Sequence, residues 1–400
     1  MDLKRLMYCL DDLNETDRAF FIEMSAYLSE YIVSVSIGEN GVVLSVDPKH
    51  EEAVLEKANL LKNMIKTQFF GRDSELQTTL IEDHSNTENL NANNVFELLI
   101  GRGDVIEISP GAYAYSGLFL KVFSYFILKI DAFAREHFRQ TAERTLYVPA
   151  LFPVEGYHKG GYFDTFPHHI MFATTMKNDV EILSAFARSG LNEPHLLNET
   201  KRPENILRTA ACAPVYQILE NRCLDTKESD AFFVSGKCYR NEGKNVKELS
   251  RLNEFFMKEY VFIGAPDDVV HCINSARKLW TEWIDLFSLN CVIETANDSF
   301  FASNYKKLKL FQLLGSSKIE FKLRIPHNED YIACSSANFH RTHFTKKYNI
   351  RNADSSAFCH STCFAFGIDR LTYSLLSQKG IDPSNWDEQT INEISRYVVL

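Results

Sequence analysis

Two arginines and a phenylalanine stand close together in a stretch of the chain whose residue types suit a nucleotide. Residues 232–264 read FFVSGKCYRNEGKNVKELSRLNEFFMKEYVFIG. The planar guanidinium groups of Arg240 and Arg251 match oxyanions such as phosphate, and the ring of Phe255 offers a stacking face to a base. Glu242 lies two residues after Arg240, so the two side chains share one face of a strand. The segment therefore predicts a nucleotide site, with an ordinary hairpin and a solvated charged tip as the alternative.

The elements that must position these side chains are two antiparallel strands. Each flanking run alternates apolar with polar residues and is rich in β-branched and aromatic side chains, which is typical of strands. A long, charged turn joins them. Further along, the apolar strand CFAFG leads into a helix that begins near Ile368 and carries Arg370 in its first turn. A cation at the positive end of a helix is unfavourable, which indicates an anionic partner; a solvated arginine is the alternative.

The length and the distribution of charge indicate two unequal domains. A chain of 400 residues exceeds one small core. Residues 83–94, DHSNTENLNANN, are polar and without period, so we expect a linker between a small α+β domain at 1–95 and a larger domain at 96–400. Residues 1–100 hold 18 of the 53 acidic and 8 of the 43 basic residues, which leaves 35 of each in the remainder. The acidic first domain is therefore poorly suited to gripping a nucleic-acid backbone.

The composition predicts a cytoplasmic protein. Hydrophobic residues make up 45% of the chain and charged residues 24%, as in soluble globular proteins. The most apolar stretch, 117–133, is interrupted by Lys121, Lys129 and Asp131, which favours a core helix over a membrane span. We expect no secretory signal, because no apolar run and cleavage site follow the N-terminus. Nine irregularly spaced cysteines favour reduced thiols, a few of them recruited by a metal.

Hydrophobic patterns predict the remaining elements. We expect a hairpin around GENG in the first domain, a long helix over 118–141, a strand pair over 160–178 and an amphipathic helix over 267–289. A long helix followed by a strand with prolines suits contact between two copies across a dyad, and packing within one chain is the alternative. His168 and His169 are metal-ligand types, but adjacent residues on a strand face opposite ways, which argues against one shared site.

The order of three short motifs resembles the class II aminoacyl-tRNA synthetases. YRNE followed by RLNEF resembles motif 2, FGIDRL resembles motif 3, and the long helix with its proline-bearing strand resembles motif 1. The segments AACAPVY, FFMKEYVFIG, KIEFKLRIP, ACSSANFHRTHF and HSTCFAFGIDRL are similar to the amino acid:[carrier protein] ligases, truncated relatives of the methanogen-type seryl-tRNA synthetases. The resemblance covers about residues 107–387. It implies an α+β fold with an antiparallel sheet flanked by helices.

The resemblance also gives the nucleotide-site residues their roles. It implies that Arg240 binds the substrate carboxylate and the α-phosphate of ATP, and that Arg251 and Arg370 bind the γ-phosphate, with Arg240 and Arg370 as the catalytic cations. Glu242 would hold the adenine, and Phe255 would stack on it. The physical logic agrees, because joining a carboxylate to a phosphate requires positioning and cationic stabilisation, helped by Mg²⁺.

Zinc is the second cofactor that the resemblance implies. The family's two cysteines and one glutamate map onto Cys212, Glu259 and Cys334, and three protein ligands leave a fourth position for the substrate amine. Without the resemblance, each cysteine is more simply a buried hydrophobe. Glu259 has independent support, since a carboxylate in the apolar run FFMKEYVFIG needs a cation. The pair Cys359 and Cys363 is a competing set of metal ligands. His340 and His343 suit hydrogen bonds to the ligands or contacts with the substrate.

Three functions follow as hypotheses. The first is ATP-dependent activation of a small amino acid and its transfer to the phosphopantetheine thiol of a carrier protein, by a homodimer that binds neither membrane nor tRNA. The second is a seryl-type aminoacyl-tRNA synthetase whose first domain binds tRNA, and the third is a non-catalytic relative. We expect the carrier to dock near the lysines at positions 306, 307 and 309 or 346 and 347.

Overall fold

A large twisted sheet forms the centre of the protein. The computed structural model describes residues 3–68, 77–87, 91–138, 142–190, 194–225, 229–298, 300–301, 305–314 and 317–400. Eight strands hydrogen-bond side by side, all antiparallel except for the parallel edge pair β12 and β7. In spatial order they are β4 (Leu80–Asp83), β14 (Cys291–Thr295), β15 (Lys318–Ile325), β16 (Asp330–Arg341), β18 (His360–Gly367), β13 (Glu254–Gly264), β12 (Asp230–Tyr239) and β7 (Thr145–Tyr147).

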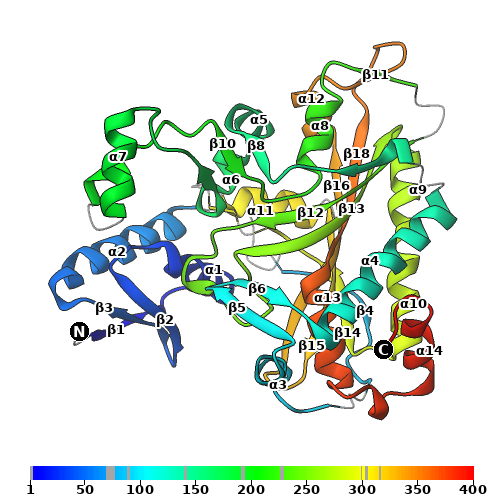
Figure 1. Ribbon diagram of the computed structural model, residues 1–400, viewed down its shortest axis with the longest axis horizontal. Coiled ribbons are helices and arrows are strands. Elements are labelled where there is room, and N and C mark those ends of the chain that lie inside the picture. The colour runs from blue at the N-terminus through cyan, green and yellow to red at the C-terminus, as the bar shows by residue number, and fades with distance from the viewer. Residues whose placement is uncertain are drawn as a thin grey trace.

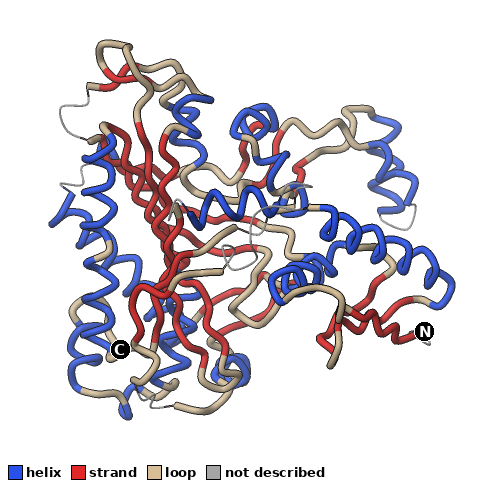
Figure 2. Tube along the Cα trace, turned by 180° about the vertical axis from the view of Figure 1, so that it is seen from behind, coloured by secondary structure: helices blue, strands red, loops and turns tan. Residues whose placement is uncertain are grey.

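One face of this sheet is covered by helices, which lie along the right-hand side in Figure 1. The alternation of β18 shows why: Phe364 and Phe366 point into this core, whereas Cys363, Ala365 and Gly367 point to the opposite face. Figure 2 shows the strands as a twisted layer beside the same helices. The elements on this side are α3 (Val95–Arg102), α4 (Gly117–Phe138), α9 (Pro266–Ala276), α10 (Lys278–Phe287), α13 (Ile368–Lys379) and α14 (Glu388–Ser395).

The opposite face is covered only in part, by short elements that form a second apolar cluster. They are α5 (Val154–Gly160), α6 (Tyr162–Thr165), α8 (Ala213–Ile218) and α12 (His343–Lys347), with β8 (Leu151–Pro153), β10 (Asn205–Leu207) and β9 (Met171–Ala173) as a small sheet. Elsewhere lie α7 (Val180–Ser189) and the strand pairs β5 (Val105–Ser109) with β6 (Ala112–Tyr115) and β11 (Cys223–Leu224) with β17 (Arg351–Asn352). The predicted α+β fold with an antiparallel sheet flanked by helices is confirmed.

The N-terminal unit lies at the lower left in Figure 1. Its sheet, in the order β1 (Lys4–Cys9), β3 (Gly41–Val46) and β2 (Ile32–Gly38), packs against α1 (Glu15–Met24) and α2 (Glu51–Thr67). The hairpin expected around GENG is β2 and β3. The apolar core of this unit also includes Phe300 and Tyr305, and Tyr305 is the first residue of α11 (Tyr305–Leu314). Residues distant in sequence therefore complete this core.

The expected linker is not a clean division between the parts of the structure. Strand β4, which ends where the linker was placed, pairs with β14 and forms one edge of the large sheet. Part of the expected linker, residues 88–90, lies outside the described residues. The boundary at residue 95 stays a prediction, and residues before it contribute to the larger sheet.

Two expected elements differ from the structure. Residues 160–178 do not form a strand pair, because Gly161 and Pro167 break the run and α6 and a 3-10 turn replace most of it, leaving only β9. The helix over 267–289 is two helices, α9 and α10, divided at Arg277. The expected long helix is α4. Among the helices of the described residues, none combines the length and the apolar character needed to cross a bilayer.

Candidate active site

A cavity of about 1390 Å³ opens on the partly covered face of the large sheet. Its floor is formed by β13, β16 and β18, whose outward-facing residues include Glu259, Ser336 and Ala365. The turn between β12 and β13 forms one wall, and α1 and α11 contribute another. Arg240, Glu242, Arg251, Phe255 and Arg370 all line this one cavity.

Two thiols and a carboxylate converge at the floor of the cavity. Cys212, Glu259 and Cys363 are all buried, and one ligand atom from each lies within 4.8 Å of the others. The Cys363 Sγ atom donates to Glu259 Oε2 at 3.0 Å, and the Ala211 amide donates to Glu259 Oε1 at 2.9 Å. Glu259 and Cys363 meet because β13 and β18 are neighbours, and Cys212 joins them from the N-terminus of α8.

This cluster fits a zinc ion. A carboxylate oxygen about 2.0 Å and a sulfur about 2.3 Å from a tetrahedral zinc ion are about 3.5 Å apart. The three atoms here lie within 4.8 Å of one another, so each needs to move by only about 1 Å to bind the ion. Burial raises the pKa of Cys363 well above its usual value. The hydrogen bond with Cys363 lowers the pKa of Cys212, but burial and the charge of Glu259 have the larger combined effect, so the pKa of Cys212 is raised overall. A bound cation is what stabilises thiolates in such surroundings.

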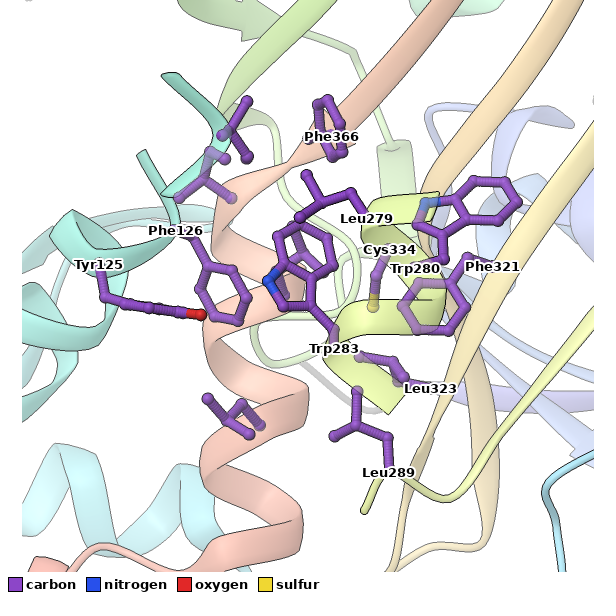
Figure 3. Close-up of a cluster of buried hydrophobic side chains, with 14 of the residues drawn as sticks. Tyr125, Phe126, Leu279, Trp280, Trp283, Leu289, Phe321, Leu323, Cys334 and Phe366 are labelled. Atoms are coloured by element: carbon purple, nitrogen blue, oxygen red, sulfur yellow. The ribbon is translucent and has the colours of Figure 1, made fainter. Parts of the chain in front are cut away.

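Cys334 is not part of this cluster, contrary to the expectation from the sequence. Its thiol contacts the hydroxyl of Ser374 at 3.2 Å and the carbonyl oxygen of Ile332 at 3.4 Å. Figure 3 shows its sulfur among Trp280, Trp283 and Phe321 in the apolar core. Burial raises the pKa of this thiol to about 12. Cys363 takes the place expected for Cys334.

The physical reason is a β-bulge. The pairing of β15 with β16 passes from Phe321↔Ser335 to Lys322↔Ala333, so Cys334 is the extra residue. Counting by two from Asn338 places Cys334 on the cavity face, but the extra residue reverses that alternation. Ser335 and Cys334 therefore both face the helices, and Ser335 accepts a hydrogen bond from Trp280 Nε1 at 2.9 Å.

Three arginines gather beside the cluster. Arg240 Nε donates to the Thr209 carbonyl oxygen at 3.2 Å, and its guanidinium carbon lies 5.1 Å from the centre of the Phe255 ring. Arg370 Nη1 donates to the Ala333 carbonyl oxygen at 2.9 Å. Burial, and then the charge of Arg251, lower the pKa of Arg370. Such a concentration of partly buried positive charge favours an anionic ligand.

Arg251 differs from the other two arginines because carboxylates hold it. Its Nη1 lies 3.3 Å from Glu242 Oε2, and its Nη2 lies 2.9 Å from Glu23 Oε1. Burial alone would lower the pKa of Arg251, but the charges of Glu23 and Glu242 raise it. Glu23 comes from α1, more than 200 residues away in sequence, and no local pattern in the sequence pointed to it.

The histidines also lie at the cavity or its edge. His340 and His343 line the cavity, and the His340 Nδ1 atom is 3.0 Å from the Tyr216 hydroxyl. Burial lowers the pKa of His340 to about 3. His168 and His169 occupy a 3-10 turn with ring centres 4.0 Å apart, rather than opposite faces of a strand. Neither they nor Cys359 belongs to the metal-type cluster found among the described residues.

Geometry and sequence comparison agree on the class of protein. Residues 196–379 match the model of the tRNA synthetase class II core domain (G, H, P, S and T), so this part of the chain is similar to a class II synthetase core. The fold comparison agrees: the chain superimposes on the M. kandleri SerRS in complex with A. aeolicus tRNASec with a TM-score of 0.69 and 19% identity, over 98% of this chain and 77% of the other. The superposition on the cytoplasmic serine–tRNA ligase of Naegleria fowleri in complex with AMP has a TM-score of 0.59 and 12% identity, and it covers 87% of this chain and 79% of the other.

Among named relatives, the chain is similar to a carrier-protein ligase and to seryl-tRNA synthetases, as expected from its motifs. It is 29% identical to amino acid–[acyl-carrier-protein] ligase 1 of Bradyrhizobium diazoefficiens over 283 residues, 70% of this chain and 83% of the relative. It is 28% identical to the type-2 serine–tRNA ligase of Methanocaldococcus jannaschii over 248 residues, 60% of this chain. That match spans 47% of the relative's length, about half.

Proposed function

We propose that this protein activates a small amino acid with ATP and transfers it to the phosphopantetheine thiol of a carrier protein. The observation that carries the proposal is the single cavity that joins the cluster of Cys212, Glu259 and Cys363 to the three arginines. Similarity to the carrier-protein ligase over 83% of that relative's length supports the choice of acceptor.

In this proposal each residue has a role in forming the adenylate. Arg240 bonds to the carbonyl oxygen of Thr209, three residues before Cys212, so in this proposal it receives the amino-acid carboxylate and the α-phosphate. Arg251 and Arg370 neutralise the outer phosphates, with Mg²⁺ as their companion. Phe255 lies beneath Arg240 and provides the surface on which the adenine stacks, and Glu242 binds its amino group.

Cys212, Glu259 and Cys363 would hold zinc, with the open side toward the cavity. When bound, zinc would supply a Lewis-acid site that coordinates a free amine and so selects amino acids. Glu259 would keep its orientation through the hydrogen bond from the Ala211 amide.

The test is amino-acid-dependent exchange of pyrophosphate into ATP, measured with each of the twenty amino acids. The proposal expects exchange with one or a few small amino acids and its loss after zinc is chelated. Mass spectrometry of phosphopantetheinylated carrier proteins then tests the transfer. Exchange with no amino acid, by a folded and zinc-loaded protein, would refute the proposal.

A seryl-type tRNA synthetase is the second candidate, because the fold match to the M. kandleri enzyme spans 98% of this chain and so extends to the N-terminal unit. The acidic excess of residues 1–100 argues against it. A gel shift with bulk tRNA separates the two functions. Tight binding that weakens steeply with salt supports the synthetase, and weak binding supports carrier transfer.

We also propose that the protein is a homodimer. The edge strand β7 exposes 82% of Tyr147, and α4 exposes Leu120 and Leu128, so apolar groups suited to a second copy lie on the elements resembling motif 1. Light scattering tests this directly, and a mass of 46.0 kDa at micromolar concentration would contradict it.

The expected docking of a carrier near Lys306 is wrong for that residue. Lys306 is buried and forms an ion pair with Asp17 of the N-terminal unit, so it is not accessible to a partner. The side chain of Lys307 lies outside the described residues. Lys309, which is partly buried and lines the cavity, and the exposed side of α12 with Lys346 and Lys347 stay candidates for the docking surface.

A further inference from the structure

Helix α1 of the N-terminal unit forms part of the wall of the nucleotide cavity. Thr16, Phe20 and Glu23 lie four and three residues apart, so they share one face of the helix, and all three line the cavity. Asn14 caps the helix by accepting from the Asp17 amide, which starts α1 where this face meets the site. The match to the class II core domain begins at residue 196 and so does not include this helix.

Two sets of contacts hold α1 in place. Toward α11, Asp17 binds Lys306 Nζ at 2.8 Å and the Tyr305 hydroxyl at 2.6 Å, and the ring of Phe20 stacks on that of Tyr305 at 3.8 Å. Only 5% of Asp17 and 7% of Lys306 are exposed. Removing either partner would leave a buried charge, so the docking of α1 is specific rather than loose.

The second set connects the end of α1 to the turn between β12 and β13. The Tyr27 hydroxyl donates to the Asn241 carbonyl oxygen at 3.0 Å, and the Asn245 side chain donates to the Glu23 carbonyl oxygen at 3.0 Å. The Glu23 carboxylate lies 2.9 Å from Arg251 Nη2. The backbone and the side chain of Glu23 therefore both hold this turn.

The ion pair with Glu23 conflicts with phosphate binding by Arg251. A phosphate oxygen and the Glu23 carboxylate require the same guanidinium N–H groups, and they repel each other if they are close. Arg251 lies on the side of the cavity formed by α1, whereas Arg240 bonds to Thr209 near the sulfur cluster. The conflict therefore concerns the phosphates beyond the first.

We propose that Glu23 is a positioning residue of the nucleotide site, which holds Arg251 and the turn beside it until the outer phosphates of ATP replace its carboxylate on the guanidinium. This inference rests on the proposed function. ATP binding then weakens the contact between α1 and the turn, and by linkage a partner that pulls α1 away favours ATP. The N-terminal unit thus responds to the nucleotide without contributing a catalytic group.

Calorimetric titration of the full-length protein with MgATP and with AMP tests the proposal. In Glu23→Gln, ATP should bind roughly two- to fivefold more tightly, the range expected for losing a partly exposed competing ion pair, while AMP affinity changes by less than about 1.5-fold. Glu23→Asp keeps the charge but shortens the side chain, and should give a smaller gain. Glu15→Gln is the matched control, because it removes a carboxylate that lines the cavity from the same helix.

A double-mutant cycle tests whether Glu23 acts on ATP affinity through Arg251. In an Arg251→Gln background, Glu23→Gln should no longer change ATP affinity, because the two residues act through one contact. The proposal is overturned if Glu23→Gln leaves ATP affinity unchanged, shifts ATP and AMP equally, or acts equally without Arg251. If the unmodified protein binds neither ATP nor AMP, the proposed function itself fails. An unchanged ATP affinity in Glu23→Gln, with the unmodified protein binding ATP, defeats only the role of Glu23.

Discussion

Replacing Cys363 and Cys334 separately by alanine tests the location of the metal site. Cys363 Sγ lies 3.0 Å from Glu259 Oε2, within the cluster that includes Cys212, whereas Cys334 is in the apolar core on the other face of the sheet. Loss of residues that merely support a ligand costs about 10- to 100-fold in metal affinity. Cys363→Ala, which removes a ligand itself, should therefore weaken zinc by at least about 100-fold, or about 2.7 kcal/mol.

The matched variant Cys334→Ala should keep its zinc. Its cost is in stability, about 1 to 2 kcal/mol, because a buried sulfur and its contact with Ser374 are lost. The assay is zinc content after dialysis, followed by competition with a chromogenic chelator and by pyrophosphate exchange. Circular dichroism during urea unfolding reports the stability of both proteins. If Cys334→Ala loses zinc and Cys363→Ala retains it, the cluster described here is not the metal site.

Three further predictions concern single contacts. Arg240→Ala should reduce pyrophosphate exchange by about 100- to 1000-fold with little change in unfolding midpoint, because its contacts with the Thr209 carbonyl oxygen and the Phe255 ring are weak beside those proposed with the ligands; unaltered exchange would remove its catalytic role. Lys306→Met should lower the free energy of unfolding by about 3 to 5 kcal/mol in urea titrations by leaving Asp17 unpaired, and a loss below about 1 kcal/mol would contradict a buried ion pair. Burial lowers the pKa of His340 from 6.5 to about 3. Below pH 6.5 the unfolded chain therefore binds a proton at His340 that the folded protein does not bind. The free energy of unfolding then falls with acidification by up to about 1.4 kcal/mol per pH unit. His340→Gln should flatten that slope between pH 6.5 and 4, and an identical slope in the two proteins would refute the assignment.

Alternation and turn residues were sufficient for much of the fold and for the arginine-lined part of the cavity. The segment around Arg240 and Arg251 is two antiparallel strands joined by a turn, and both arginines line one cavity with Arg370. Arg240 and Arg251 lie in the turn itself, after Tyr239 and before Glu254, so the pairing of β12 with β13 brings them together, whereas the expected sharing of one strand face by Arg240 and Glu242 does not apply. The roles of these residues with ATP stay predictions.

The cluster that fits a metal required information that alternation does not contain. A single extra residue in β16 turns Cys334 away, and a sequence does not reveal a bulge. Cys363 was recognisable in principle, since Cys363, Ala365 and Gly367 alternate away from Phe364 and Phe366. The signal was available, but it required knowing that β18 lies beside β13.

Long-range contacts account for the remaining differences. The pairing of Glu23 with Arg251 joins residues that are 228 positions apart in sequence, and the packing of α1 against Tyr305 and against the turn between β12 and β13 brings them together. The expected division at residue 95 rested on the polar composition of 83–94. Composition reports solubility of a segment but not whether the strand before it pairs with a distant neighbour.

The position of β4 has a practical consequence for anyone who trims this chain to the size of its shorter relatives. A protein beginning at residue 96 would lose the strand that borders β14, and the freed backbone N–H and C=O groups of β14 would form an open template for other chains. Such a truncated protein should assemble edge to edge and precipitate. Solubility of a fragment that starts instead before Leu80 would show how much of that protection this short strand provides.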